Sequence, residues 1–109
     1  MRGGWVYMMS DRYRGAIYIG VTAYIAQRGF QHRSREGSAF CRRYGIDRLV
    51  YADWTESIVD AIARERAMKK WRRAWKIELI ERVNPDWSDL FEVINGGAEE
   101  GAGSPLSRG

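Results

Sequence analysis

Residues 4–22 read GWVYMMSDRYRGAIYIGVT, and this stretch decides the fold. Its two ends, residues 4–9 and 16–21, are rich in the aromatic and β-branched side chains that favour strands. The polar residues 10–15 between them include a glycine and are typical of a turn. We therefore predict that the domain opens with a β-hairpin.

A helix and a basic loop are expected after the hairpin. Thr22 is a good helix N-cap, and apolar side chains at helical spacings predict a first helix over residues 23–33. Residues 34–47 are rich in Gly, Ser and Arg, which indicates a basic loop with one short helical piece. Residues 48–54 are again β-branched and aromatic and predict a third strand.

The second half of the chain carries a long helical pattern. Apolar residues recur at the helical period over residues 55–83, and so long a span is expected to break near residues 71–74. Asn84-Pro85 ends the pattern, because the residue before a proline is disfavoured in helical conformation. Residues 86–91 are expected to add one helical turn that packs aromatic side chains back onto the domain.

The 109 residues are enough for one domain, since two cores of ordinary size would need a longer chain. The order of the elements predicts a small mixed α+β domain over residues 1–94, with helices packed against a mainly antiparallel sheet. Residues 95–109 are rich in Gly, Ala, Ser and Glu and are expected to form a flexible tail.

The composition also indicates in which cellular compartment the protein is expected. No apolar run approaches the roughly 20 residues that span a bilayer, and residues 1–5 lack the pattern of a signal peptide. The lone Cys41 cannot form an intrachain disulfide, which fits a reducing compartment. We therefore expect a cytoplasmic protein without a membrane partner.

The charge balance favours a polyanionic partner. Lys and Arg number 18 and Asp and Glu number 14, which gives a net charge of +4. Leaving out Glu99, Glu100 and Arg108 of the tail, the balance is 17 against 12, or +5. Of the 18 cations 15 are arginines, whose planar guanidinium pairs bidentately with phosphate.

Two tyrosines and a glycine stand out in the predicted hairpin. Tyr7 and Tyr18 lie on opposite arms, so strand pairing can bring the rings together. Tyrosines in sheets commonly do no more than pack. Gly20 adds to the functional interpretation, because a glycine inside a strand often marks the close approach of another backbone or a ligand. The residues alone leave both interpretations open.

Arg28 and His32 form a second candidate pair. They are four positions apart on the predicted first helix and therefore share one face, and His32 is the only histidine of the chain. They are either a solvated surface pair, or a cation that binds a phosphate beside an imidazole that moves a proton.

Glu65 is the most informative single residue. Its spacing from Ile62 and Met68 places it in the apolar stripe of the long helical pattern. One interpretation is an edge position at which Lys69, four residues later, pairs with the carboxylate. The other is a metal ligand or catalytic carboxylate, because burial of an unpaired charge is costly. Both interpretations remain open at this point.

Five cations and two tryptophans alternate over residues 69–76. The cations either face solvent or contact phosphates, and the tryptophans either pack in the core or stack on unpaired bases. We expect the tryptophans mainly in the core and the cations at a nucleic acid, together with two arginines of the preceding loop. The predicted nucleic-acid contacts are Arg42, Arg43, Lys69, Lys70, Arg72 and Arg73.

Taken together, these residues resemble the GIY-YIG nuclease superfamily, and within it the small single-domain branch of bacterial endonucleases. The resemblance covers about residues 5–91. Trp5-Val6-Tyr7 stands in place of the first triplet, and Tyr18-Ile19-Gly20 is the second. The later elements are Thr22, Arg28, His32, Arg43-Tyr44-Gly45, Arg48-Leu49-Val50-Tyr51, Glu65-x-x-Met68-Lys69-Lys70-Trp71-Arg72-Arg73 and Asn84-Pro85-x-Trp87-x-Asp89-Leu90.

The resemblance implies a three-stranded antiparallel sheet flanked by helices, which cuts phosphodiester bonds with one divalent metal. The motif residues carried over are the two tyrosines, the helix arginine, the histidine four positions later and the metal-binding glutamate, here Tyr7, Tyr18, Arg28, His32 and Glu65. Asn84 matches a later asparagine of several branches, or it only ends the helix. The first triplet departs from Gly-Ile-Tyr at two scaffold positions and keeps its tyrosine.

The reaction that the resemblance implies requires a metal ligand, a general base and groups that bind the phosphate. Glu65 is expected to hold Mg²⁺ or Mn²⁺, with water at most of the other metal positions. Water attacks phosphorus in line, with Tyr7 or Tyr18 as general base, and the residues do not distinguish the two tyrosines. Arg28 is expected to stabilise the phosphoryl charge, and His32 to position or relay the proton.

We therefore expect a metal-dependent DNA endonuclease. The alternative is a nucleic-acid-binding module that keeps the scaffold and does not cut. The complete set of motif residues favours the enzyme, because a pure binder has no use for an inward-aimed Glu65. Expected partners are DNA of unspecified strand structure and a separate targeting protein, since 109 residues hold no attached recognition domain. We expect the protein to be a monomer.

Overall fold

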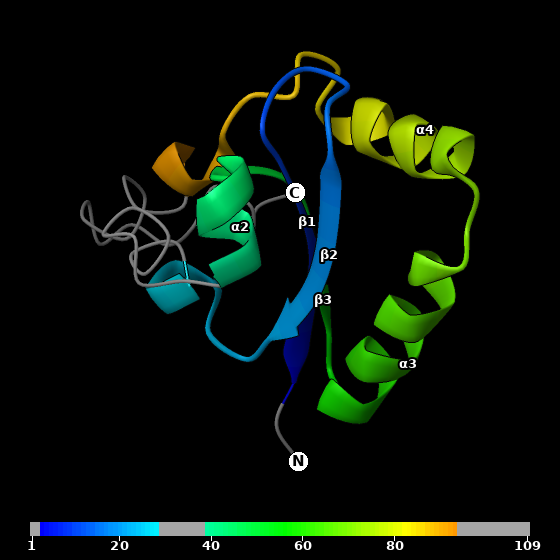
Figure 1. The fold of residues 1–109 in the computed structure, drawn as a ribbon. Helices are drawn as coiled ribbons and strands as arrows, with labels where there is room; N and C mark the ends of the chain where they lie inside the picture. The colour runs from blue at the N-terminus through cyan, green and yellow to red at the C-terminus, as the bar shows by residue number, and fades with distance from the viewer. Residues whose placement is uncertain (1–2, 29–38, 94–109) are drawn as a thin grey trace.

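The computed structural model describes residues 3–28 and 39–93. The chain contains both strands and helices, and Figure 1 shows the sheet with helices on both sides. The elements are β1 (Gly4–Ser10), β2 (Ile17–Thr22), α2 (Ala39–Tyr44), β3 (Arg48–Thr55), α3 (Ile58–Lys69) and α4 (Arg73–Val83). Two further helical turns lie at residues 25–28 and 90–93.

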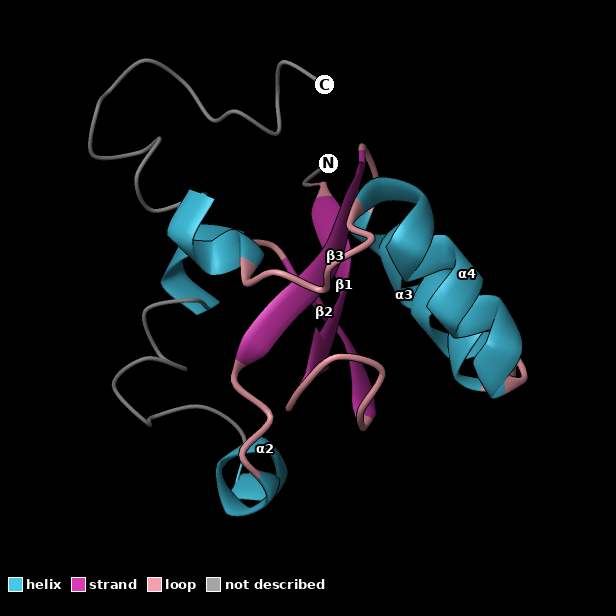
Figure 2. Cartoon of the chain, turned by 90° about the horizontal axis from the view of Figure 1, so that it is seen from above, coloured by secondary structure: helices cyan, strands magenta, loops and turns pink. Residues whose placement is uncertain are grey.

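The three strands form one antiparallel sheet in the order β2-β1-β3. The predicted hairpin is confirmed, and it pairs Trp5 with Thr22 at one end and Ser10 with Ile17 at the other. Figure 2, seen from above, shows α3 and α4 on one side of the sheet and the remaining helical segments on the other. The predicted α+β class, with helices against an antiparallel sheet, is therefore correct.

The central strand β1 is buried on both faces, and this creates two cores. Val6 and Met8 point to the face covered by α3 and α4, where they join one apolar cluster. Tyr7 and Met9 point to the other face and join a second cluster under α2. Alternate residues of a strand point to opposite faces, so one short apolar strand supplies both cores.

A bulge in β3 changes this alternation locally. Met8 of β1 pairs with Tyr51 and Met9 pairs with Leu49, so Val50 is the extra residue between them. An extra residue lets two successive side chains face the same way. Val50 and Tyr51 accordingly both belong to the cluster under α3 and α4. Nothing in the apolar run of β3 marks the bulge in advance.

The long helical pattern is two helices, as predicted, but its start and its break differ from the prediction. The prediction began the helix at residue 55, whereas β3 continues through Thr55 and Ser57 caps α3, its side chain accepting a hydrogen bond from the Asp60 amide at 3.4 Å. The break lies at residues 70–72, where the amides of Lys70 and Trp71 bond back to the last turn of α3.

The segment after α4 packs its aromatics as expected, though not as one helical turn. Trp87 and Phe91 are both fully buried, which confirms the packing. Residues 86–88 are irregular and the helical turn begins only at residue 90. Trp87 takes a positive φ of 56°, a left-handed conformation that few residues other than glycine adopt. The tail predicted over residues 95–109 lies outside the described residues.

The hairpin turn is tied to α4 by ion pairing. Arg14, at the turn, donates two hydrogen bonds to the Glu81 carboxylate, from Nε at 2.6 Å and Nη2 at 2.7 Å. Trp87 donates its indole N–H to the same carboxylate at 2.8 Å. Arg73 donates to the carbonyl oxygens of Arg14 and Gly15, the latter at 2.7 Å.

Within the described residues no helix is long and apolar enough to cross a bilayer.

Glu81 should make stability sensitive to acid. Hydrogen bonds from Arg14 and Trp87 lower the pKa of Glu81 from 4.5 to about 2, so the unfolded chain takes up this proton first as pH falls. The free energy of unfolding, measured by urea titration, should decrease between pH 4.5 and 2. Glu81→Gln should be less stable at pH 7 and lose this part of the acid dependence, while Glu56→Gln, at an exposed site, should keep it. Equal acid dependence in both variants would contradict the assignment.

Candidate active site

Tyr7 lies directly over Gly20 of the neighbouring strand. The two residues are paired in the β1–β2 register, and a Cβ built on Gly20 would lie 2.6 Å from both Cζ and Oη of Tyr7. Real Cβ contacts of this length do not occur, so the tyrosine ring occupies the space that a side chain at position 20 would need. The close approach predicted from Gly20 is therefore that of the Tyr7 ring, not of a backbone.

The two motif tyrosines share one face of the sheet. Their ring centroids are 6.5 Å apart with planes inclined at 59°. Tyr7 is 2% exposed, whereas Tyr18 is half-buried and packs at the edge of the same cluster. Strand pairing therefore brings the rings together, as expected, with one hydroxyl deep in the site and the other nearer its rim.

Burial and several neighbouring groups act on the pKa of the Tyr7 hydroxyl. Burial raises the pKa of Tyr7 from 10.0 to about 12, and the positive charge of Arg28 opposes this increase. Tyr18, Cys41 and Glu65 each raise the pKa slightly further. The Tyr7 hydroxyl is therefore within electrostatic reach of groups from β2, α2, α3 and the turn at residues 25–28.

Arg28 presents an unused hydrogen-bond donor. It is the last described residue of the helical turn at residues 25–28, and its amide donates to the Tyr24 carbonyl at 3.0 Å. In the part of the chain that the structure describes, its side-chain Nε is buried and has no hydrogen-bond partner. A buried guanidinium donor without an acceptor is costly, and a phosphate oxygen would satisfy it. His32, predicted to act with Arg28, lies outside the described residues.

Glu65 flanks the buried stripe of α3. Ala61 and Met68 form that stripe and are fully buried, and Glu65 lies beside them with 15% of its side chain exposed. Lys69 binds the carboxylate at 2.9 Å, which is the i,i+4 pair of the first interpretation. The negative charge of Glu65 also contributes to the raised pKa of Tyr7, as the smallest of the causes that act on it.

The family model for the GIY-YIG catalytic domain matches residues 3–78. The chain belongs to the GIY-YIG family. This is a family of nucleases, generally endonucleases that depend on a divalent metal, and a nuclease domain indicates DNA as substrate. Comparisons with curated proteins and with solved structures found no match. The resemblance noted in the sequence is thereby confirmed, and the match includes the tyrosines, Arg28 and Glu65.

The donor set of this GIY-YIG site fits a hard cation held mainly by water. No group of three His, Cys, Asp or Glu side chains converges anywhere in residues 3–28 and 39–93. The Glu65 carboxylate is the one acidic group among those that act on the Tyr7 hydroxyl. Mg²⁺ usually keeps several waters and takes only one or two protein carboxylates. A single carboxylate beside tyrosine hydroxyls therefore suits this ion.

The six predicted nucleic-acid cations differ in what they contact. Arg42 and Arg43 lie in the last turn of α2, with the Arg43 guanidinium 5.6 Å from the Tyr44 ring centroid. Lys69 pairs with Glu65, and Lys70 is the exposed C-cap of α3. The remaining two are Arg72, which stacks over Trp75 at 4.9 Å, and Arg73, which binds the hairpin carbonyls.

The two tryptophans of this segment are less buried than expected. Trp71 is half-buried against the core, but Trp75 is 49% exposed, so the expectation that it packs inside is wrong. Trp75 instead meets the edge of Trp71, with centroids 6.2 Å apart. Trp75 lies on α4 and Trp71 on the link before it. The helical period of the sequence does not reveal that α4 turns Trp75 outward.

Asn84 and Cys41 complete the surroundings. Asn84 is buried, and its amide group donates to the carbonyls of Val50 at 3.1 Å and Ser88 at 2.9 Å. Its oxygen accepts from the Ser88 amide, so the side chain holds the end of α4 to β3.

The sequence assigned no site role to Cys41. It is buried next to Tyr7, and no sequence signal indicates that position.

Gly20→Ala should reveal the contact with Tyr7. The added methyl group overlaps a buried, rigid ring, so we expect a loss of about 1–3 kcal/mol in the free energy of unfolding. In a Tyr7→Leu background the ring is absent and the same substitution should cost much less. A double-mutant cycle by urea denaturation measures the difference. Equal costs in both backgrounds would contradict the packing of Tyr7 over Gly20.

Proposed function

We propose that this protein is a metal-dependent endonuclease that hydrolyses phosphodiester bonds in DNA with water as the nucleophile. The observation that carries the proposal is that a GIY-YIG chain packs the Tyr7 and Tyr18 rings 6.5 Å apart, with Arg28 and Glu65 near enough to influence the Tyr7 hydroxyl. Two hydroxyl groups, one unpaired guanidinium donor and one carboxylate supply proton transfer, phosphate binding and a metal ligand at one place.

Glu65 would hold Mg²⁺ or Mn²⁺. When bound, the ion supplies Lewis-acid stabilisation of charge on the phosphate and on the leaving oxygen. Lys69 pairs with the same carboxylate at 2.9 Å and is 54% exposed, so it can turn away into solvent at small cost when the carboxylate is used otherwise.

A tyrosine hydroxyl, Tyr7 or Tyr18, accepts the proton of the attacking water. At Tyr7 the raised pKa of about 12 keeps the proton on Oη at neutral pH, so base catalysis there depends on cationic neighbours. Arg28 is the described group that lowers this pKa. In our proposal Arg28 therefore binds a phosphate oxygen through Nε and also favours the ionised form of Tyr7.

His32 keeps the role that the family resemblance implies, in which it positions or relays the proton. The cations Arg42, Arg43, Lys70 and Arg72 lie exposed and supply sequence-independent contacts to phosphates. We omit Arg73 from this surface, since its guanidinium already binds two carbonyl oxygens of the hairpin turn.

Arg28→Ala separates the enzyme from a module that only binds. If Arg28 stabilises charge in the transition state, its loss should lower the single-turnover cleavage rate by about 10²–10³ with little change in affinity. Arg28→Lys should restore only part of the rate, because a point charge replaces the bidentate group. Cleavage of labelled single-stranded, duplex and branched DNA at saturating protein, in Mg²⁺ or Mn²⁺, is measured beside binding isotherms.

Arg66→Ala is the matched control, because Arg66 is an exposed arginine of α3. This substitution should change the cleavage rate and the DNA affinity by no more than the loss of one exposed phosphate contact. An Arg28→Ala variant that loses affinity and cuts normally once bound would contradict the catalytic role. A wild-type protein that binds DNA and cuts none of the three substrates would favour the binding module.

A further inference from the structure

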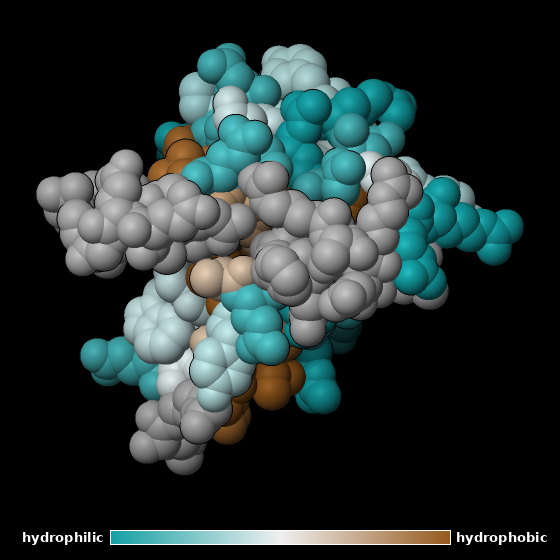
Figure 3. Space-filling model, turned by 90° about the vertical axis from the view of Figure 1, so that its left-hand side faces the viewer, coloured by the Kyte–Doolittle hydropathy of each residue, from teal (hydrophilic) through white to brown (hydrophobic). Residues whose placement is uncertain are grey.

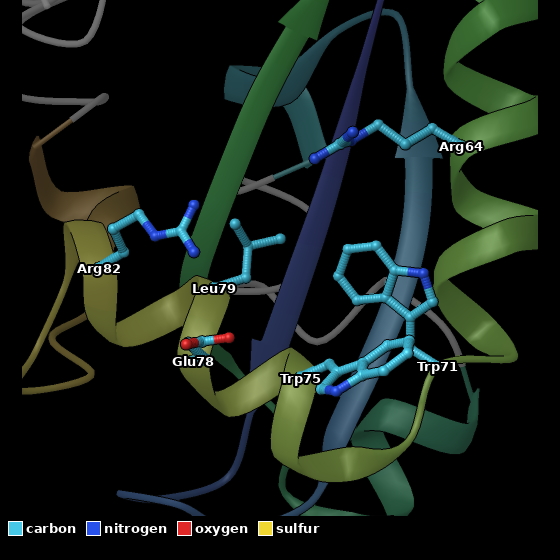
Figure 4. Close-up of a pocket in the computed structure, with 6 residues that line it drawn as sticks. All are labelled: Arg64, Trp71, Trp75, Glu78, Leu79 and Arg82. Carbon is cyan, nitrogen blue, oxygen red and sulfur yellow. The ribbon is translucent and has the colours of Figure 1, made fainter.

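A pocket of about 310 Å³ lies between α3 and α4, apart from the tyrosine site. Such a volume is at the lower end of the ~300–1,000 Å³ typical of small-molecule sites, so it suits one small group. Figure 4 shows the indole rings together on one side and the Arg64 side chain reaching across from α3. The lining residues are Arg64, Trp71, Trp75, Glu78, Leu79 and Arg82.

The aromatic side of the pocket is accessible. Trp71 rests on the core and meets Trp75 edge to face, with ring planes inclined at 78°. Trp75 is 49% exposed, and the Arg72 guanidinium stacks over its ring at 4.9 Å. Figure 3, which displays another side of the molecule, shows mostly hydrophilic surface with hydrophobic residues in separate areas. An exposed indole beside a half-buried one offers an apolar surface on which a planar ligand can pack.

The polar side of the pocket has more donors than acceptors. Within the described residues, Nε of Arg64 is buried and makes no hydrogen bond, and its ion pair with the Asp53 carboxylate is long, at 3.8 Å. Its Nη2 makes only a long contact of 3.4 Å to the Tyr51 hydroxyl. Two lining arginines face one lining glutamate, so the pocket favours an anionic or acceptor-rich ligand.

The pocket and the tyrosine site lie on opposite flanks of one helix. Glu65 and Arg64 are consecutive, and about 100° of rotation separates them around the buried stripe of α3. Arg64 turns to Asp53 and Tyr51 of β3, whereas Glu65 acts on Tyr7. The exposed Lys70 and Arg72 join α3 to the pocket side of α4. A strand bound at Glu65 could therefore continue along these cations towards the indoles.

We infer that this pocket binds one unpaired nucleobase of the DNA, with its ring against the tryptophans and its hydrogen-bond acceptor atoms at Arg64. The inference rests on the proposed function and deepens it, because it selects substrates with a single-stranded segment beside the cut. Every base offers a stacking face, so the site reads strand structure and not sequence. A docking peptide would leave the positive charges of the rim without phosphates to neutralise them.

The test compares Trp75→Ala with Trp54→Ala. Trp54 is 48% exposed and lies on β3 outside the pocket, so it matches Trp75 in residue type and exposure. Binding of the full chain to fluorescently labelled oligothymidine and to a fully paired duplex is measured by anisotropy, in chelator to prevent cleavage. Trp75→Ala should weaken oligothymidine binding about 5- to 150-fold, the equivalent of ~1–3 kcal/mol for one stacked base, and leave duplex binding unchanged.

Two further variants keep the outcome interpretable. Trp75→Phe retains a stacking ring and should restore most of the affinity for oligothymidine, whereas Trp54→Ala should match wild type on both ligands. Equal weakening by Trp75→Ala and Trp54→Ala, or equal weakening for duplex and single strand, would overturn the pocket assignment. So would a wild-type protein that binds no oligothymidine, which would leave the groove to a protein partner.

The pocket and the nuclease activity can fail separately. A protein that binds oligothymidine through Trp75 but cuts no DNA would retain the pocket and refute the endonuclease. A protein that cuts DNA at a rate dependent on Arg28, with Trp75→Ala unchanged in binding, would retain the endonuclease and refute the pocket.

Discussion

The burial of β1 on both faces is the constraint on which the structure depends. A seven-residue strand supplies Val6 and Met8 to one core and Tyr7 and Met9 to the other. A register slip of one residue would exchange the two sets and move the tyrosine from the site into the core under α3. The position of Tyr7 is therefore set by the packing of its neighbours as much as by its own contacts.

The active site that we propose draws on the hairpin and on helical segments on either face of the sheet. The hairpin would provide both tyrosines, with Gly20 leaving room for the Tyr7 ring, and the helical segments would provide Arg28 and Glu65. The same burial that fixes Tyr7 raises its pKa, so the buried hydroxyl is harder to ionise at neutral pH. A cation nearby, as Arg28 is, becomes necessary for any site of this design.

Much of this could be predicted from the sequence, because it depends on local patterns. The hairpin, the two-helix division of residues 55–83 and the position of Glu65 beside the buried stripe of α3 all follow from period and composition. The features that could not be predicted depend on tertiary contacts. The bulge at Val50, the positive φ of Trp87 and the outward turn of Trp75 have no local signal in the chain. Likewise, Arg73 looks like any exposed cation until the hairpin turn lies against it.

The most direct test of the account is the metal-dependent cleavage rate of Glu65→Gln. This variant keeps the size and hydrogen-bonding capacity of the side chain and removes the charge that would hold the ion. The account predicts that wild type cuts DNA in Mg²⁺ or Mn²⁺ and is inactive in chelator, and that Glu65→Gln remains folded and binds DNA but does not cut. Glu56→Gln, at an exposed site, should cut like wild type. Cleavage by Glu65→Gln at the wild-type rate would contradict the account.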